Sequence, residues 1–122
     1  LSKLVQELCG FTVQPNQPIV GESLYNIESG VVTMFHRRCR DVAPTEYLPF
    51  LPEVVGRPGV DVVLGKGSGA ANVEEHLERR GRTATEAQIM DMVLAVKQRS
   101  IEKKGLLTDA EFDEIVARVV PG

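Results

Sequence analysis

Apolar positions recur at helical spacing through the later part of the chain. In residues 85–104 they fall three and four residues apart, which predicts one long helix with a single inward face. Thr85 and Gln88 have the spacing of a capping box at its start, and Gly105 is expected to end it. The inward positions are Ile89, Met92, Val93, Val96, Ser100 and Ile101.

A shorter helix is expected just before this one, over residues 70–80. Val73 and Leu77 are one turn apart and face inward, and Gly81 closes the helix. His76 stands among glutamates and is predicted to lie on the solvated face. The sequence therefore defines one apolar stripe and the C-terminal end of this helix.

A second capping box, Thr108 with Glu111, predicts a last helix that stops at Pro121. Its inward positions are Phe112, Ile115, Val116 and Val119. Three consecutive helices with one apolar face each can bury those faces against one another. Residues 70–122 are therefore predicted to form a three-helix subdomain.

The first residues of the chain also carry a helical stripe, which Gly10 ends. The stripe comprises Leu1, Leu4, Val5 and Leu8. Because this helix starts at the first residue with no capping residue before it, we expect the chain to be a piece of a longer protein.

Prolines make most of the remaining first half irregular. Residues 11–30 and 41–59 contain repeated prolines and are predicted to be loops. Residues 31–40 form a short helix with Val31, Met34 and Phe35 inward, and residues 60–64 form a short strand.

These elements together predict a mainly α fold in two parts. Residues 1–69 form an extended, loop-rich arm with one or two helices, and residues 70–122 form the three-helix bundle. At most one short strand pair is expected. A long loop in a small domain usually has a function or lies against a partner surface.

Composition and charge exclude several classes of function. The 122 residues include 14 Lys and Arg against 17 Asp and Glu, and no half is basic enough to indicate a nucleic-acid partner. No apolar run reaches the roughly 18–20 residues that a membrane span needs. Cys9 and Cys39 are predicted to be free, buried thiols in the reducing cytoplasm.

One glycine-rich turn is a candidate binding loop. Gly65-Lys66-Gly67-Ser68-Gly69 follows the short strand and precedes a helix, a setting in which backbone N–H groups can bind phosphate. Its spacing matches neither a P-loop nor a dinucleotide-binding fingerprint. A flexible strand-to-helix connector explains the same residues.

The other candidate chemistry lies in the helix over residues 31–40. His36 and Cys39 are one turn apart, but two ligands fall short of the four of a structural zinc site, so no metal is predicted. Arg37, Arg38 and Arg40 could bind an anion or form a solvated helix face. Taken alone, these residues do not define an active site.

Four stretches carry related motifs in this order: residues 15–30, Tyr47 with residues 55–57, residues 64–69 and residues 107–111. Together they resemble the segment that follows the catalytic barrel in isopropylmalate, homocitrate and citramalate synthases. Residues 15–30 resemble the family's Asn-x-x-Ile-Val-Gly block and its Glu-Ser-Gly. Tyr47 with residues 55–57 gives the second match. Residues 64–69 resemble Leu-Gly-Lys-His-Ser-Gly, and residues 107–111 resemble Leu-Thr-Asp-Glu-Glu. The match is collinear over nearly all 122 residues.

The resemblance implies an enzyme whose barrel binds a divalent metal and a 2-oxo acid, with acetyl-CoA supplying the nucleophilic carbon of a Claisen condensation. It implies no cofactor within the present segment. It also implies a homodimer, in which this segment leaves its own barrel and borders the partner's active site. Tyr47 and His36 are then candidate catalytic residues, while Glu28, Ser29 and Gly30 cover the active site.

The chain departs from the family pattern at three histidines. These fall on Ile27, Val32 and Gly67. An aliphatic side chain cannot transfer a proton, so His36, one turn beyond Val32, is the candidate replacement. Tyr47 is retained.

Two rival hypotheses belong to other classes. The chain could be a stand-alone helical interaction module without a catalytic role. It could also be a small regulatory domain that binds a CoA-like phosphate at Gly65–Gly69. Under the enzyme hypothesis the isolated chain is expected to be inactive, because the barrel is absent from it.

Overall fold

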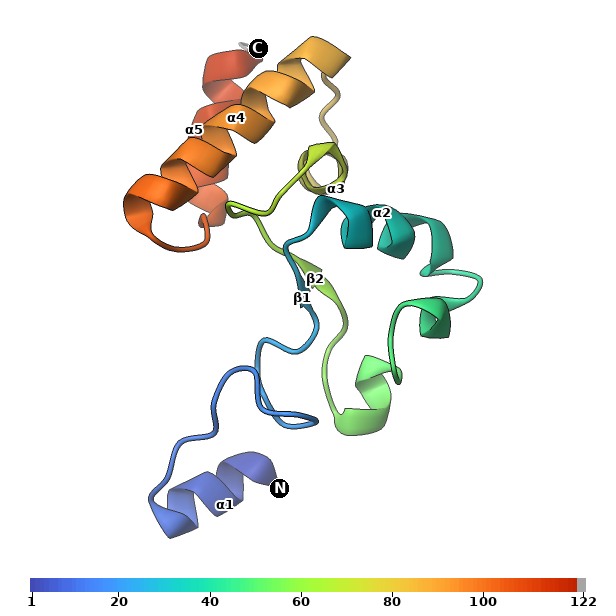
Figure 1. Cartoon of the computed structure of the whole chain (residues 1–122), viewed down its shortest axis with the longest axis vertical. Helices are drawn as coiled ribbons and strands as arrows, with labels where there is room; N and C mark the ends of the chain where they lie inside the picture. The colour runs from blue at the N-terminus through green and yellow to red at the C-terminus, as the bar shows by residue number, and fades with distance from the viewer. Residues whose placement is uncertain (121–122) are drawn as a thin grey trace.

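The computed structural model describes residues 1–120 and is mainly α-helical (Figure 1). The helices are α1 (Ser2–Cys9), α2 (Gly30–Cys39), α3 (Ala70–Arg79), α4 (Glu86–Lys103) and α5 (Asp109–Val119). The strands β1 (Asn26–Ile27) and β2 (Asp61–Val62) form one parallel pair, and two short 3-10 helices span Pro44–Glu46 and Pro52–Val55. The predicted mainly α fold with one short strand pair is confirmed. The helices predicted at both ends are present, whereas β1 and the two 3-10 helices lie in segments predicted to be loops.

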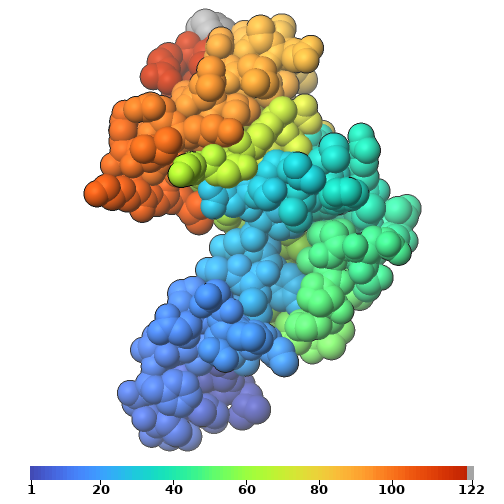
Figure 2. Space-filling model, viewed as in Figure 1, coloured from blue at the N-terminus to red at the C-terminus, as the bar shows by residue number. Residues whose placement is uncertain are grey.

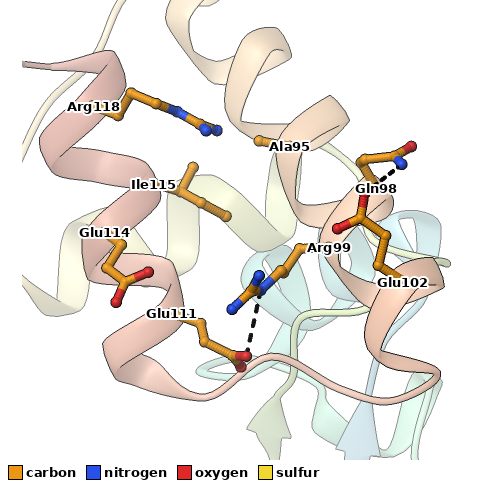
Figure 3. Close-up of a pocket in the computed structure, with 8 residues that line it drawn as sticks. All are labelled: Ala95, Gln98, Arg99, Glu102, Glu111, Glu114, Ile115 and Arg118. Carbon is orange, nitrogen blue, oxygen red and sulfur yellow. Dashed lines mark hydrogen bonds and ion pairs between the residues drawn. The ribbon is translucent and has the colours of Figure 1, made fainter.

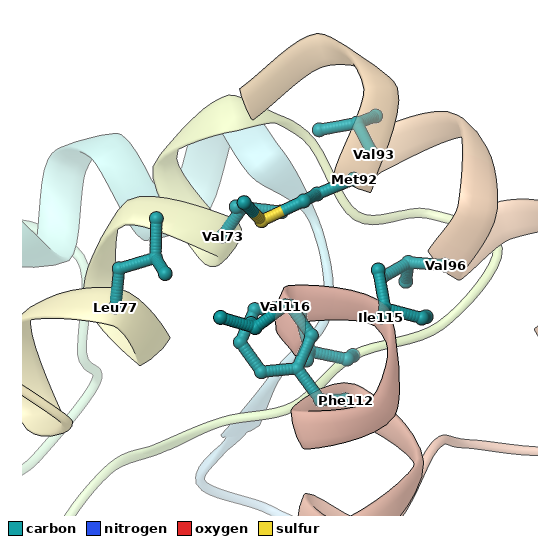
Figure 4. Packing of buried hydrophobic residues seen from close by; sticks show 9 residues of the cluster. Val73, Leu77, Met92, Val93, Val96, Phe112, Ile115 and Val116 are labelled. Atoms are coloured by element: carbon teal, nitrogen blue, oxygen red, sulfur yellow. The ribbon is translucent and has the colours of Figure 1, made fainter. Parts of the chain in front are cut away.

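A single apolar cluster lies between α3, α4 and α5 (Figure 4). Its buried members are Leu64, Val73, Leu77, Met92, Val93, Val96, Phe112, Ile115 and Val116. Removing apolar surface from water is worth roughly 25 cal/mol per Å², so this cluster is the main source of stability for the three helices. The inward positions predicted for α3 and α5 are confirmed.

The C-terminal end of α4 differs from the prediction in two respects. Ile101 is 53% exposed, because the last turn of α4 borders a surface cavity beside Leu106 rather than the core. The helix also ends one residue early, at Lys103, and the C-cap residue Lys104 has a left-handed φ of 57°. Gly105 follows this cap.

Both predicted capping boxes are present. The Thr85 N–H donates to Gln88 Oε1 at 2.9 Å, and the Gln88 N–H donates to Thr85 Oγ1 at 3.3 Å. The Thr108 N–H donates to Glu111 Oε2 at 2.8 Å, and the Glu111 N–H donates to Thr108 Oγ1 at 3.3 Å. These side chains satisfy helix N–H groups that have no partner within the helix.

The charge of Glu111 should make stability depend on acid pH. A hydrogen bond from Lys103 at 2.7 Å, then the one from the Thr108 N–H, lowers the pKa of Glu111 from 4.5 to about 2. A depressed carboxyl pKa stabilises the folded state above the unfolded value of 4.5, and that contribution disappears as the pH falls toward 2. We therefore expect the melting temperature to fall over this interval.

Glu111→Gln keeps an acceptor oxygen for the cap but removes the charge, so its melting temperature should fall less steeply between these two pH values. Glu114→Gln on the same helix is the matched control and should keep the parental slope. Circular dichroism melts across the pH series measure both. Identical slopes in the parent and in Glu111→Gln would contradict the assignment.

The orientation predicted for α2 is wrong. Val31, Met34 and Phe35 were expected to face inward, yet they are 63%, 36% and 50% exposed. Thr33 and His36 are buried instead. The apolar stripe of α2 thus has no partner among residues 1–120, and the helix packs through its polar side.

Ion pairs explain this reversal. Arg37 bonds to Glu74 and, at 2.6 Å, to Glu78, while Arg40 bonds to Glu75 at 3.1 Å, all on the facing side of α3. Glu75 is only 5% exposed, so leaving its charge unpaired would be costly. Arg37 and Arg40 therefore join two helices and do not form a solvated face.

His76 is buried, which corrects its predicted place on the solvated face of α3. Its Nε2 lies 2.7 Å from the carbonyl oxygen of Val62 on β2, and its ring meets Phe112 edge-on at 5.5 Å between centroids. Burial lowers the pKa of His76 below its ordinary 6.5. Because α3 packs against α2, α4 and β2, and its His76 also meets Phe112 of α5, it has little solvated surface.

The N-terminal helix lies apart from this core. Figure 2 shows α1 and the residues just after it as a lobe at the end farthest from α4 and α5. None of the α1 side chains is buried. Cys9 is exposed and Cys39 half-buried; both are free as predicted, but neither is fully buried. Among residues 1–120, no helix has the length and apolar character to cross a membrane.

Candidate functional site

Two predicted motifs that are far apart in the sequence meet where the strands end. Asn26 pairs with Asp61 and Ile27 with Val62, in parallel. Because parallel strands point the same way, the segments that follow them leave the sheet side by side. Residues 28–30 therefore lie against the turn over residues 65–69.

The contact between these motifs is close. The Gly67 N–H donates to Glu28 Oε1 at 2.7 Å, and the Gly30 N–H donates to the Gly67 carbonyl at 3.4 Å. A Cβ added to Gly30 would lie 2.9 Å from the Cα of Gly69, so a side chain there would force the two backbones apart. The glycines are thus required by a backbone crossing.

Asn72 fastens this junction, and the sequence reasoning missed it. Its side chain is fully buried; Nδ2 donates to the Glu28 carbonyl at 3.0 Å and to the Val63 carbonyl at 3.3 Å. Its Oδ1 accepts from the Gly69 N–H at 3.1 Å. The available signal was an asparagine three residues after Gly69, where a side chain can cap the helix.

The Gly65–Gly69 turn already has internal partners for part of its backbone. The Gly65 N–H donates to Ser68 Oγ at 2.9 Å, and the Gly67 N–H is taken by the carboxylate of Glu28. An anion bound by the Gly67 N–H would have to displace Glu28. The phosphate-binding role of this turn stays a prediction.

His36 and Tyr47 form a hydrogen-bonded pair. Nδ1 of His36 lies 2.7 Å from the Tyr47 hydroxyl, and the rings meet edge-on at 5.5 Å between centroids. His36 comes from the buried face of α2, and Tyr47 follows the first 3-10 helix. The structure therefore brings together the two residues predicted to be catalytic.

Burial sets the protonation of this pair. It lowers the pKa of His36 below its ordinary 6.5 and raises the pKa of Tyr47 above its ordinary 10.0. At neutral pH the imidazole is uncharged and the phenol keeps its proton, so Tyr47 can donate to an unprotonated Nδ1. An imidazole in this state can also take up a proton.

A cavity of about 260 Å³ opens beside the pair. Tyr47 forms part of its wall, together with the predicted covering residues Glu28 and Ser29. Val32, at the position where the resemblance predicts a histidine, lines it as well. The remaining lining residues are Leu24, Tyr25, Asn26, Ile27, Leu48 and Pro49. His36 does not line this cavity, but it is hydrogen-bonded to Tyr47, which does.

The motif over residues 15–21 is structural. The Gly21 N–H donates to the Gln17 carbonyl at 2.8 Å, and the Ser23 N–H donates to the Pro15 carbonyl at 2.8 Å. A Cβ on Gly21 would lie 2.4 Å from the Pro15 carbonyl oxygen, which only glycine avoids. This motif folds the backbone into a tight turn and brings no titratable group to the cavity.

A second cavity, between α4 and α5, is lined mainly by charged groups (Figure 3). Arg99 lies 3.5 Å from Glu111, and Gln98 donates to Glu102 at 2.7 Å. Both signs of charge line the cavity. The pair of Arg99 with Glu111 joins the two helices, whereas Gln98 and Glu102 both belong to α4. Among residues 1–120, no three His, Cys, Asp or Glu side chains are grouped so as to hold a metal ion.

Known proteins similar to this chain cover nearly all of it. A protein of Archaeoglobus fulgidus that is assigned as an (R)-citramalate synthase is 39% identical to this chain over 98% of the chain's residues. The 2-isopropylmalate synthase of Dictyoglomus turgidum is 32% identical, and a homocitrate synthase of Methanothermobacter thermautotrophicus is 36% identical, each over 98% of this chain. No family model matches.

The chain spans only 23%, 24% and 29% of the length of these three relatives. It is therefore similar to a small part of each. The resemblance predicted from the sequence motifs, to a segment of citramalate, isopropylmalate and homocitrate synthases, is confirmed.

Proposed function

We propose that this chain is the segment that follows the catalytic barrel in a synthase of this kind and covers an active site where acetyl-CoA condenses with a 2-oxo acid. The observation that carries the proposal is the position of Tyr47. Its hydroxyl is hydrogen-bonded to His36 and its side chain lines the same cavity as Glu28 and Ser29. A titratable pair beside a cavity is the usual arrangement of a proton-transfer site.

The pair could remove a proton from the methyl group of an acetyl thioester. In that step the methyl proton passes to the Tyr47 oxygen while the phenolic proton passes to Nδ1 of His36. His36 becomes positively charged and the thioester becomes an enolate, so charge is conserved. Its lowered pKa leaves His36 unprotonated at neutral pH, ready for this role.

The divalent metal and the groups that bind the 2-oxo acid would belong to the barrel. His36 and Cys39 are the only His and Cys on α2, and no third ligand is grouped with them among residues 1–120. The present chain would contribute its two side chains and the cavity wall, and the metal, when bound in the barrel, would polarise the 2-oxo acid.

The second part of the proposal is that this segment bridges two subunits of a homodimer. Two exposed apolar surfaces support it: the stripe of α1 and the outward face of α2 formed by Val31, Met34 and Phe35. Apolar surfaces of this kind usually mark an interface. Their partner would be the chain's own barrel or the second subunit.

The isolated chain should show no condensing activity. Without a barrel it lacks the metal and the substrate-binding groups on which the reaction depends. Release of the CoA thiol from acetyl-CoA, followed with a panel of 2-oxo acids, measures this. The full-length protein is the positive control, and turnover by the isolated chain above the enzyme-free rate would refute the proposal.

A further inference from the structure

A third cavity, of about 400 Å³, lies behind the Gly65–Gly69 turn. Two ammonium groups border it: Lys66 comes from the turn, and Lys104 is the C-cap residue of α4. Within residues 1–120 neither side chain makes a hydrogen bond or an ion pair, whereas the neighbouring Lys103 pairs with Glu111. Two lysines without partners beside one cavity favour a negatively charged occupant.

The single acid at this cavity does not cancel that charge. Glu28 also lines the cavity, and its Oε1 accepts from the Gly67 N–H at 2.7 Å. Two ammonium groups and one carboxylate leave a net positive charge. The cavity between α4 and α5 differs, because its two arginines face three glutamates, which leaves a net negative charge (Figure 3).

Lys104 is held in an unfavourable backbone conformation. Its φ of 57° lies in the left-handed region, where helices usually place glycine. The glycine of this sequence comes one residue later, at Gly105. Strain of this kind concentrates at functional positions, and here it holds a lysine at the edge of the cavity.

Two of the other lining residues, Ile101 and Leu106, are aliphatic, and the remaining two are Ser100, whose hydroxyl donates to the Gly105 carbonyl at 2.9 Å, and Gly105 itself. Ile101 is 53% exposed and Leu106 is 42% exposed, and both border the cavity. A ligand that covered them would remove apolar surface from water, which favours binding. We propose that this cavity binds a small organic anion with an aliphatic end, such as a medium-chain carboxylate.

The geometry connects this cavity to the proposed active site. Glu28 lines both the present cavity and the one beside Tyr47. Lys66 directly precedes Gly67, whose N–H holds the Glu28 carboxylate. An anion bound to Lys66 would therefore change the environment of the Gly67 amide next to it. Binding to this cavity can be measured directly, without a measurement of catalysis.

Hexanoate is a suitable probe, with inorganic phosphate as the probe that lacks an aliphatic end. Titration calorimetry at low salt should show saturable hexanoate binding and weaker phosphate binding. Lys66→Gln and Lys104→Gln should each weaken hexanoate binding by about fivefold, the upper range for an exposed charge pair. Lys97→Gln, on α4 but away from the cavity, should bind as the parent does.

A further variant separates binding from folding. Lys104→Gly removes the ammonium group and relieves the left-handed strain, so it should melt at a higher temperature and bind hexanoate more weakly. In NMR spectra, hexanoate should shift the methyl signals of Ile101 and Leu106 and the amide signal of Gly67. The inference is overturned if hexanoate does not saturate below about 10 mM, if the lysine variants bind it unchanged, or if phosphate binds as tightly.

Discussion

Phe112→Ala should lower the free energy of unfolding by about 3–5 kcal/mol, the usual cost of removing a buried aromatic side chain. Phe112 is fully buried at the centre of the cluster between α3, α4 and α5. Its ring also meets His76 edge-on, and the guanidinium of Arg80 lies 5.1 Å from its centroid. Alanine would lose both contacts and leave a cavity that the helices cannot fill.

Urea unfolding followed by circular dichroism measures this loss. Leu94→Ala is the matched control: Leu94 is on α4 but 63% exposed, so its truncation should cost at most about 0.5 kcal/mol. If Phe112→Ala does not fold, Phe112→Leu can replace it. Because leucine retains part of the side-chain volume, this variant should lose less free energy of unfolding than Phe112→Ala but more than Leu94→Ala. Equal losses of unfolding free energy in Phe112→Ala and Leu94→Ala would mean that the cluster is not the main source of stability.

The three C-terminal helices could be predicted because their signals are local. Each capping box joins residues three apart, and the stripe of Phe112, Ile115 and Val116 repeats within one helix. Such patterns need no knowledge of the rest of the chain. Helix existence and type were accordingly correct for α3, α4 and α5.

The orientation of α2 could not be predicted in the same way. Periodicity identifies the apolar face of a helix but not whether the described chain covers it. Here the partner of α2 is the carboxylate row on α3, and the ion pairs of Arg37 and Arg40 decide which side is buried. The apolar face, with Val31 and Phe35, is left outward.

The candidate site depends on contacts that no local pattern contains. Strands of two residues, such as β1, are too short to show alternation. Their pairing brings Glu28 to the Gly67 N–H across 39 positions of sequence. The motifs identified the residues, but their convergence needed the parallel pair, and the bond between His36 and Tyr47 needed the turn through the 3-10 helix.

Tyr47→Phe in the full-length protein should lower kcat by about 10- to 10³-fold, if the hydroxyl acts on the reacting groups as proposed. The substitution removes one oxygen and keeps the ring that packs edge-on against His36. A tyrosine with only a structural role would instead lose roughly 0.5–1.5 kcal/mol of stability with turnover intact. Steady-state kinetics and thermal melts of the same preparation separate these outcomes.

Tyr25→Phe provides the matched control, because it makes the same chemical change in the same cavity. The Tyr25 hydroxyl donates to the backbone carbonyl of Phe50 at 3.3 Å and has no titratable partner, so its removal should affect stability and leave kcat nearly unchanged. Comparable kcat losses in both variants would indicate that kcat depends on the shape of the cavity and not on the Tyr47 hydroxyl. Only a loss confined to Tyr47→Phe assigns proton transfer to the hydroxyl that His36 holds.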